Sequence, residues 1–326
     1  MKAILCKVHG DPETLVLDDV PSPKAGPGQV VVDVKAAGVN FPDTLIIRNL
    51  YQFKPPLPFS PGSEIAGVVK EVGDKVTHVK LGDRVVGMAG WGGFAEEIVM
   101  DGGRVFPMPP GLDFPLASAL TLAYGTTYHA LKDRGALKPG ETLLVLGAAG
   151  GTGLSAVEIG KAMGARVIAA TSSDEKCAVC REHGADAVIN YAKEDLREAL
   201  KTLTDGKGPD VVYDPVGGPY AEPALRSLGR RGRYIVIGFT AGDIPKIPLN
   251  IPLLKGNSVV GVFWGEFNCR EPKAAMAAIG ELLGLIQTGK IKPKVTASYP
   301  LAKAPQALRD MMERRVTGKV VVLPEA

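Results

Sequence analysis

Two different hydrophobic periods follow one another along this chain. In the first 125 residues, short runs rich in β-branched residues at 29–36 and 65–72 are followed by Gly-Asp turns at 73–74 and 82–83. Such runs, bounded by turn residues, are typical of strands in an antiparallel barrel or sandwich. We therefore predict a β-rich, partly closed N-terminal domain.

From about residue 126, the pattern alternates between apolar runs and segments with helical spacing of apolar residues. The runs predict strands at 143–146, 166–170, 187–189, 211–213, 234–237 and 259–263, and the spaced segments predict helices at 150–163, 174–183, 193–203 and 220–228. Strands that alternate with helices in this way form a parallel, doubly wound sheet. The predicted fold class is therefore α/β.

The C-terminal part continues with helices and short strands. Helices are predicted at 271–287 and 302–314, and strands at 294–298 and 319–323. No low-complexity linker marks a boundary, so the change of period sets it. We expect one domain from residues 1–125 and 266–326, and a second from residues 126–265.

Composition and charge exclude several classes of protein. The 326 residues carry 38 basic and 35 acidic side chains, a net charge of +3, which argues against nucleic acid and acidic membranes as partners. No apolar run reaches the ~18 residues of a membrane-spanning helix, and the first residues lack a signal-peptide pattern. We expect no membrane partner and a cytoplasmic location.

A glycine-rich loop provides the strongest local signal for function. The segment GAAGGTG follows a predicted strand and opens a predicted helix, as a dinucleotide fingerprint does. Ala148 replaces the first glycine of the fingerprint, while Gly150 and Gly153 fill the other two places. Gly151 and Thr152 begin the helix, whose free N–H groups favour phosphate. The segment therefore predicts a dinucleotide site.

The choice of cofactor depends on residues 171–176, TSSDEK, at the end of the second strand of this domain. NAD sites place an acid there to bind the ribose 2′-hydroxyl. Here the hydroxyls of Ser172 and Ser173 can donate to a 2′-phosphate, and Lys176 adds a positive charge. The acids Asp174 and Glu175 can cap the next helix, as can the serines. This pattern favours NADPH over NADH.

Blocks across nearly the whole chain resemble the quinone oxidoreductase branch of the medium-chain dehydrogenase/reductase superfamily, as found in zeta-crystallin. They are AAGVNFPD at 36–43, PPLPFSPGSE at 55–64, AYGTT at 123–127, AAGGTG at 148–153, NY at 190–191 and DPVGG at 214–218. The resemblance implies a GroES-like catalytic domain from both ends of the chain, a Rossmann domain between them, and an active site in the cleft between the two domains. It also implies a homodimer formed by edge strands, here 259–263.

The resemblance also implies roles for individual residues. Lys176 and Tyr191 match residues that hold the 2′-phosphate, and residues 150–153 match the pyrophosphate loop. Lys319 falls near the cofactor in such proteins. The segments beside the nicotinamide are Gly238, Phe239, Phe263, Trp264 and Gly265, and the cleft residues are Asn40, Asp43, Tyr51 and Thr126.

The resemblance further predicts that no zinc is bound. Zinc-dependent relatives carry a cysteine where this chain has Asn40 and a histidine where it has Ser63. Their structural zinc needs four cysteines around residues 90–110, and this chain has none between Cys6 and Cys177. Catalytic zinc wants three protein ligands. We therefore expect no metal.

Two other candidate groups are interpreted as structural. Cys177 and Cys180 form a C-x-x-C pair within a predicted helix, without a second pair nearby, so packing is favoured over zinc or redox work. His129 could approach the cleft from the helix after residue 127, but packing is again favoured.

Without zinc, hydride transfer to a quinone or an activated alkene is easier than reduction of a simple ketone. Tyr51 is the candidate proton donor, as in related enoyl-thioester reductases, although it could instead be an aromatic lid. Asn40 could hold the substrate oxygen, order the nicotinamide, or bond only to backbone. We predict an NADPH-dependent quinone or enone reductase. The alternatives are an enoyl or acryloyl thioester reductase, a zinc alcohol dehydrogenase, and a non-catalytic NADPH-binding protein.

Overall fold

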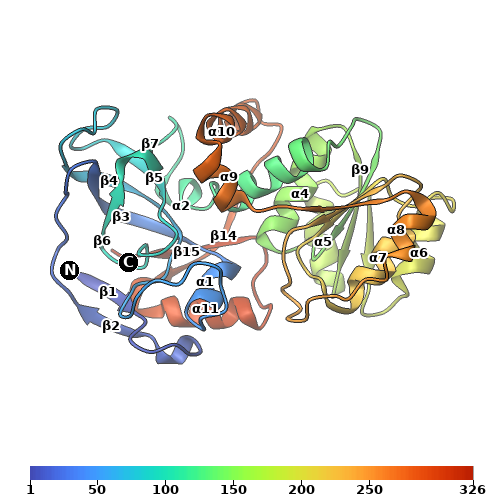
Figure 1. Cartoon of the computed structure of the whole chain (residues 1–326), viewed down its shortest axis with the longest axis horizontal. Coiled ribbons are helices and arrows are strands. Elements are labelled where there is room, and N and C mark those ends of the chain that lie inside the picture. The colour runs from blue at the N-terminus through green and yellow to red at the C-terminus, as the bar shows by residue number, and fades with distance from the viewer. Residues whose placement is uncertain (326) are drawn as a thin grey trace. The chain divides into compact units, whose positions relative to one another are not determined.

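The chain divides into two compact units in a computed structural model that describes residues 1–325 (Figure 1). The first unit combines residues 1–122 with residues from 294 onward, and the second covers Ala123–Pro293. From the sequence, we expected the chain to return to the first unit at residue 266. The chain returns later because helix α10 (Pro272–Gln287) packs on helix α3 (Ala123–Tyr128) and so belongs to the second unit. The Tyr128 hydroxyl of α3 donates to Glu281 of α10 at 2.6 Å.

The first unit is built on a seven-stranded sheet with the order β14-β15-β3-β4-β5-β7, and β6 pairs with β3. Among residues 1–325, the β14–β15 pair of this sheet is parallel and its other pairs are antiparallel. The strands are β3 (Gln29–Val39), β4 (Glu64–Val72), β5 (Arg84–Met88), β6 (Glu97–Asp101), β7 (Val105–Pro107), β14 (Val295–Pro300) and β15 (Lys319–Leu323), with a separate pair β1 (Lys2–Leu5) and β2 (Val16–Asp19). The helices are α1 (Phe41–Ile46), α2 (Phe114–Ala117) and α11 (Ala304–Met312).

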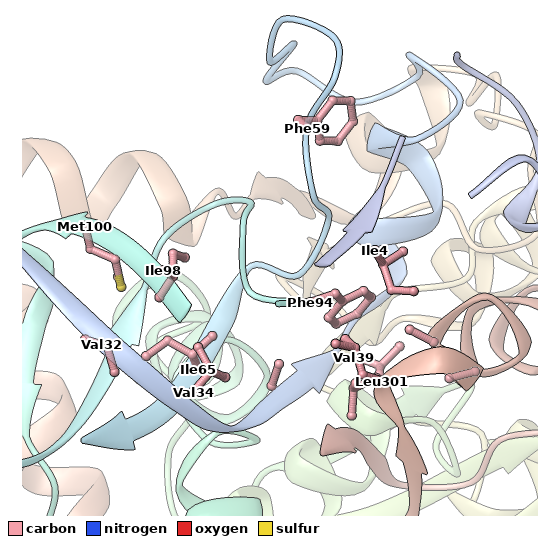
Figure 2. Packing of buried hydrophobic residues seen from close by; sticks show 14 of the residues in the cluster. Ile4, Val32, Val34, Val39, Phe59, Ile65, Phe94, Ile98, Met100 and Leu301 are labelled. Atoms are coloured by element: carbon pink, nitrogen blue, oxygen red, sulfur yellow. The ribbon is translucent and has the colours of Figure 1, made fainter. Parts of the chain in front are cut away.

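The two ends of the chain share one hydrophobic core in this unit (Figure 2). Ile4 from the N-terminal strand and Leu301 from the C-terminal segment are buried in the same cluster as Val34 and Ile65. Burial of apolar side chains from both ends fixes the C-terminal strand β15 beside β3. This pairing places Val320 opposite Val39 on neighbouring inner strands, although the two residues come from opposite ends of the sequence.

The second unit contains a six-stranded, entirely parallel sheet with the order β10-β9-β8-β11-β12-β13. This order is that of a doubly wound dinucleotide-binding fold. The strands are β8 (Thr142–Leu146), β9 (Arg166–Thr171), β10 (Ala187–Asn190), β11 (Val211–Asp214), β12 (Arg233–Val236) and β13 (Ser258–Gly261). Helices α4, α5, α6 and α7 pack on the sheet. Besides α3 and α10, the helices of this unit are α4 (Gly151–Ala162), α5 (Asp174–Glu182), α6 (Leu196–Leu203), α7 (Ala221–Ser227), α8 (Asn250–Lys255) and α9 (Trp264–Arg270).

Local chemistry explains where the predicted elements and the observed ones differ. The helix expected from residue 193 begins at Leu196, because the Asp195 side chain caps it by accepting from the backbone N–H groups of Arg197 and Glu198. The strand expected at 259–263 ends at Gly261, and helix α9 begins at Trp264. Within residues 1–325, no helix has the length and apolar character needed to cross a bilayer.

Candidate functional site

The loop after β8 forms a backbone cradle at the start of α4. Gly147 has a positive φ of 57°, and Gly150 stands at the N-cap of α4 without any side-chain cap. A Cβ on Gly153 would lie 2.7 Å from the Ala148 Cα and would also collide with the Gly147 carbonyl. A Cβ on Gly150 would meet only the Gly147 carbonyl oxygen, at 3.4 Å. The loop is therefore tight where helix and strand meet and open beside Gly150, which fits a pyrophosphate.

Ser173 and Asp174, which follow β9, already have hydrogen-bond partners within the second unit. Ser173 caps α5, because its hydroxyl accepts from the Lys176 N–H at 3.3 Å, so this serine has the capping role that the sequence left open. Asp174 accepts from the Asn190 amide at 2.6 Å and forms an ion pair with the Lys193 ammonium. Both contacts, the Lys193 hydrogen bond first, lower the pKa of Asp174. Its negative charge is therefore compensated locally.

Tyr191 follows β10 and lies beside a second tyrosine. Its backbone N–H donates to the Thr171 carbonyl at 3.0 Å, which ties it to the end of β9. Its ring centroid is 4.2 Å from that of Tyr220. Sequence reasoning did not select Tyr220, which offers no local signal beyond following a Gly-Gly-Pro turn. The two rings therefore pack against each other just after the end of β10.

The predicted nicotinamide segments follow β12 and β13. Phe239 comes directly after Gly238 and lies against Gly217, since a Cβ on that glycine would be 2.9 Å from the Phe239 ring. The turn at Gly217 is held by Asp214, which accepts from the backbone N–H groups of Val216 and Gly217 at 2.7 and 2.9 Å. The carboxyl ends of parallel strands are where ligands bind in such sheets.

Trp264 packs closely on helix α3, because a Cβ on Gly125 would lie 2.6 Å from its ring. The neighbouring Thr126 is half-buried on α3. His129 stacks on the Phe267 ring at 4.0 Å, and burial lowers its pKa. The histidine therefore serves packing in the second unit, as the sequence favoured.

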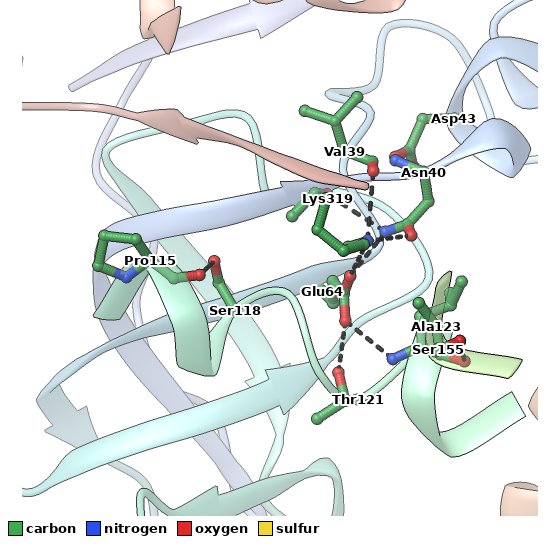
Figure 3. Close-up of polar contacts among 12 residues, drawn as sticks. Val39, Asn40, Asp43, Glu64, Pro115, Ser118, Thr121, Ala123, Ser155 and Lys319 are labelled. Atoms are coloured by element: carbon green, nitrogen blue, oxygen red, sulfur yellow. Dashed lines mark hydrogen bonds and ion pairs between the residues drawn. The ribbon is translucent and has the colours of Figure 1, made fainter. Parts of the chain in front are cut away.

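A fully connected polar network occupies the carboxyl end of β3 in the first unit (Figure 3). The Lys319 ammonium donates to the Asn40 Oδ1 at 2.6 Å, to the Glu64 Oε1 at 3.0 Å and to the Val39 carbonyl at 3.4 Å. The Asn40 Nδ2 donates to the same Glu64 oxygen at 2.8 Å. Glu64 is 0% exposed and Lys319 4% exposed. The ion pair is therefore enclosed, and each charge is compensated by hydrogen bonds.

The second oxygen of Glu64 is also satisfied. It accepts from the Thr121 hydroxyl at 2.7 Å and from the Leu122 N–H at 2.8 Å. Sequence reasoning quoted Glu64 only as part of a motif and assigned it no role. Its partners lie 24, 57, 58 and 255 positions away, so no local pattern marks it as the centre of a network.

Asp43 lies beside this network with an altered acidity. It accepts from the Asn40 N–H at 2.8 Å and is 1% exposed. Burial raises its pKa to about 7, against the opposing effect of backbone N–H donors and the Lys319 charge. Burial, and then the Asp43 charge, also raise the pKa of Tyr51. The structure thus gives three predicted catalytic residues, Asn40, Asp43 and Tyr51, a shared electrostatic environment in one unit.

The C-x-x-C pair lies within helix α5. Both cysteines are buried, and burial raises the pKa of Cys180 to about 12, so the Cys180 thiol is not activated as a thiolate. Among residues 1–325, no group of three or more His, Cys, Asp or Glu side chains is placed to hold a metal ion. The Ser63 hydroxyl is buried without a hydrogen-bond partner among these described residues.

Known proteins resemble the chain over its full length. Residues 26–110 match the alcohol dehydrogenase GroES-like domain, and residues 151–280 match the zinc-binding dehydrogenase family. The quinone oxidoreductase-like protein 2 homolog of Nematostella vectensis is 41% identical, over 98% of this chain and 88% of its own length.

Two solved structures extend the comparison. Escherichia coli quinone oxidoreductase complexed with NADPH is 33% identical with a TM-score of 0.93, covering 99% of this chain and 100% of its own. A 2-haloacrylate reductase is 29% identical with a TM-score of 0.86, covering 100% of both chains.

The GroES-like first unit, the doubly wound second unit and these matches define a medium-chain dehydrogenase/reductase. Within that superfamily, the chain belongs to the quinone oxidoreductase branch and is an oxidoreductase. The family and the α/β fold class expected from the sequence are confirmed.

Proposed function

We propose that this protein is an NADPH-dependent reductase that transfers hydride to quinones or other α,β-unsaturated carbonyl acceptors without zinc. The observation that carries the proposal is the backbone cradle of residues 147–153 under the uncapped start of α4. This cradle suits a dinucleotide pyrophosphate. The similarity to an NADPH-complexed quinone oxidoreductase and to a 2-haloacrylate reductase supports an electron-poor conjugated acceptor.

The choice of NADPH is supported by charge at the end of β9. Asp174, the acid that could bind a ribose 2′-hydroxyl, is already held by Asn190 and Lys193. We assign the 2′-phosphate to Lys176 and Tyr191, with Ser172 as a further donor. Ser173 contributes less, because its hydroxyl caps α5.

Zinc independence is supported by the side chains at the two ligand positions. Although residues 151–280 match a family named for zinc binding, Asn40 has its amide committed to Glu64 and Lys319. Ser63 supplies a hydroxyl where a zinc site would use imidazole or thiolate.

Bound NADPH would supply the hydride, and the chain's own residues would orient the reactants and provide a proton. We assign the role of proton donor to the Tyr51 hydroxyl. The charge of Asp43 raises the pKa of this hydroxyl. Because the pKa of Asp43 is about 7, this carboxyl can exchange a proton near neutral pH.

A turnover screen tests the proposed function directly. Purified protein should oxidise NADPH faster than NADH with quinones, simple enones, or acryloyl- and crotonyl-type thioesters. A preference for thioesters over quinones would establish the enoyl-thioester alternative. Tight NADPH binding without turnover of any acceptor would establish the non-catalytic alternative. Stoichiometric zinc by elemental analysis would overturn the zinc-free assignment.

We also propose that the protein is a cytoplasmic homodimer assembled through β13. This strand is the edge of the parallel sheet, and Val259 on it is half exposed. Leu253 and Leu254 of the preceding helix α8 are each 79% exposed. An apolar edge of this kind is normally covered. Within residues 1–325 none of the four cysteines forms a disulfide, which suits a reducing compartment.

A further inference from the structure

The backbone of Tyr220 is fixed by the turn that precedes it. Gly217 and Gly218 both have positive φ angles, 66° and 55°, a conformation that favours glycine at both positions. The Asp214 carboxylate at the end of β11 holds this turn by accepting from the Gly217 N–H at 2.9 Å. Tyr220 follows as the last residue of a short 3-10 helix and the N-cap of α7. The turn therefore determines where the Tyr220 ring lies.

The Tyr220 ring packs on Tyr191 and on the hydrophobic core of the second unit. The two ring centroids are 4.2 Å apart, and the ring planes are tilted by 39°. Both rings are partly buried against the same cluster of apolar side chains, which includes Leu196 and Ala221. Among residues 1–325, the Tyr220 hydroxyl makes no hydrogen bond. The contact with Tyr191 is therefore made by the ring of Tyr220 and not by its hydroxyl.

This contact restricts a side chain that would otherwise be mobile. The Tyr191 backbone is tied to β9, because its N–H donates to the Thr171 carbonyl at 3.0 Å. Its partly exposed ring still has two side-chain torsions to fix, and a side chain that must be ordered when a ligand binds lowers the affinity. The Tyr220 ring supplies that order before any ligand is present.

We propose that Tyr220 is a positioning residue for cofactor selection, because its ring holds Tyr191 in the place from which the Tyr191 hydroxyl binds the adenosine 2′-phosphate of NADPH. This inference rests on the proposed function, which assigns that phosphate to Lys176 and Tyr191. All three residues belong to the second unit. NADH lacks the 2′-phosphate, so a fixed Tyr191 raises the affinity for NADPH alone. Tyr220 thereby contributes to the choice of cofactor without touching the phosphate.

Substitutions at the two tyrosines separate the ring of Tyr220 from its hydroxyl. Tyr220→Leu removes the ring and keeps an apolar side chain over the cluster, while Tyr220→Phe removes only the hydroxyl. Tyr191→Phe removes the proposed phosphate donor, and its combination with Tyr220→Leu measures the coupling between the two residues. Phe267→Leu is the matched control, since it removes a ring that stacks on His129 at 4.0 Å elsewhere in the same unit.

Dissociation constants for NADPH and NADH are measured by calorimetry, and circular dichroism checks that each variant folds. Tyr191→Phe should weaken NADPH about tenfold or more, as loss of a hydrogen bond to a charged group does. Tyr220→Leu should weaken NADPH about three- to tenfold and change NADH by no more than about twofold, because only an ordered Tyr191 is lost. The double variant should bind NADPH like Tyr191→Phe, since an absent hydroxyl cannot be positioned.

The conservative variant, the control and a pair of shorter ligands complete the test. Tyr220→Phe keeps the ring contact, so it should bind both cofactors like the wild type. Phe267→Leu should leave the ratio of NADPH to NADH affinity unchanged, whatever it does to stability. Binding of 2′,5′-ADP and ADP should repeat the pattern of NADPH and NADH, because these ligands differ by the same phosphate and lack the nicotinamide end.

The possible results separate this proposal from the proposed function. Equal losses of NADPH and NADH affinity in Tyr220→Leu would place the ring against the adenosine that both cofactors share, and would overturn the positioning role. A Tyr220→Phe variant that loses as much NADPH affinity as Tyr220→Leu would also overturn it, because the hydroxyl would then contact the phosphate. Effects that multiply in the double variant would show that the two residues act independently. Unchanged NADPH affinity in both Tyr191→Phe and Lys176→Ala would overturn the 2′-phosphate assignment itself, and this inference with it.

Discussion

Asp43 illustrates how burial of one side chain can set a property that the sequence does not reveal. The resemblance of the segment NFPD to the family implied that Asp43 is a cleft residue. Its acidity depends on being enclosed, 1% exposed, beside the Asn40–Glu64–Lys319 network. Burial disfavours the charged carboxylate more than the nearby donors favour it. The result is a carboxyl group that titrates near pH 7.

Asp43→Asn should therefore change the pH dependence of stability. Because the folded-state pKa is raised, the folded protein holds this proton more tightly than the unfolded chain. The contribution is fully present below the unfolded pKa of about 4 and is lost as pH rises to about 7. Relative to Asp43→Asn, the wild type should lose up to about 1.4 kcal/mol of unfolding free energy per pH unit in that window.

Denaturant unfolding at several pH values between 4 and 8 measures this difference. The exposed Asp74→Asn is the matched control, and its curve should run parallel to that of the wild type. If the Asp43→Asn curve also ran parallel between pH 4 and 7, the raised pKa would be contradicted.

Lys176→Ala tests the 2′-phosphate assignment. Loss of a charge-assisted contact should raise the dissociation constant for NADPH about tenfold or more, while NADH, which lacks that phosphate, should change by no more than about twofold. Lys201→Ala, an exposed lysine on α6, should leave both unchanged. Fluorescence titration gives both constants. Equal losses for the two cofactors would refute the assignment.

Single residues were predictable where a local motif marks them and missed where only the fold brings them together. Gly150 and Gly153 were found because their spacing reflects a strand–loop–helix turn. Glu64 was missed because its role depends on Lys319, 255 positions later. Tyr220 was missed because its ring contacts Tyr191 only when the strands of the sheet are arranged in their folded order.

At the level of elements, the two glycines of the loop should respond differently to alanine. In Gly153→Ala the new Cβ meets the backbone of Ala148 and Gly147, which cannot move without separating α4 from β8. We expect a loss of about 1–3 kcal/mol of unfolding free energy, as in overpacked sites. In Gly150→Ala the new Cβ meets only one atom at 3.4 Å.

Gly150→Ala should accordingly retain the thermal stability of the wild type while losing NADPH affinity, because the methyl group occupies space beside the pyrophosphate. Melting curves and calorimetry measure both properties for the two variants. Similar stability losses in both would show that the loop is not open at Gly150.

Most regular elements were predictable because their period is imposed by burial. The inner strands β8, β9 and β11 are buried and mostly apolar, as strands covered on both faces must be. Boundaries were less accurate, since they depend on caps such as Asp195. The point where the chain returns to the first unit was expected too early, because no local pattern shows to which unit α10 belongs. Its packing on α3 and the Tyr128–Glu281 contact place it in the second unit.

For the whole molecule, the proposed dimer can be tested at β13 without breaking the sheet. The N–H groups of Ser258 and Val262 point to β12, where they donate to Gly232 and Val236. Because direction alternates along a strand, the Val259 N–H points away from β12. Val259→Pro therefore removes a donor from the free edge and leaves the bonds to β12.

If β13 pairs with the same strand of a second copy, light scattering should give twice the chain mass for the wild type and a lower mass for Val259→Pro. Leu81→Ser, which removes a 71% exposed leucine from the first unit, is the matched control and should stay dimeric. A monomeric wild type would contradict the dimer. A dimeric Val259→Pro with unchanged dissociation would place the interface elsewhere, and the exposed leucines of α8 would then be the next surface to test.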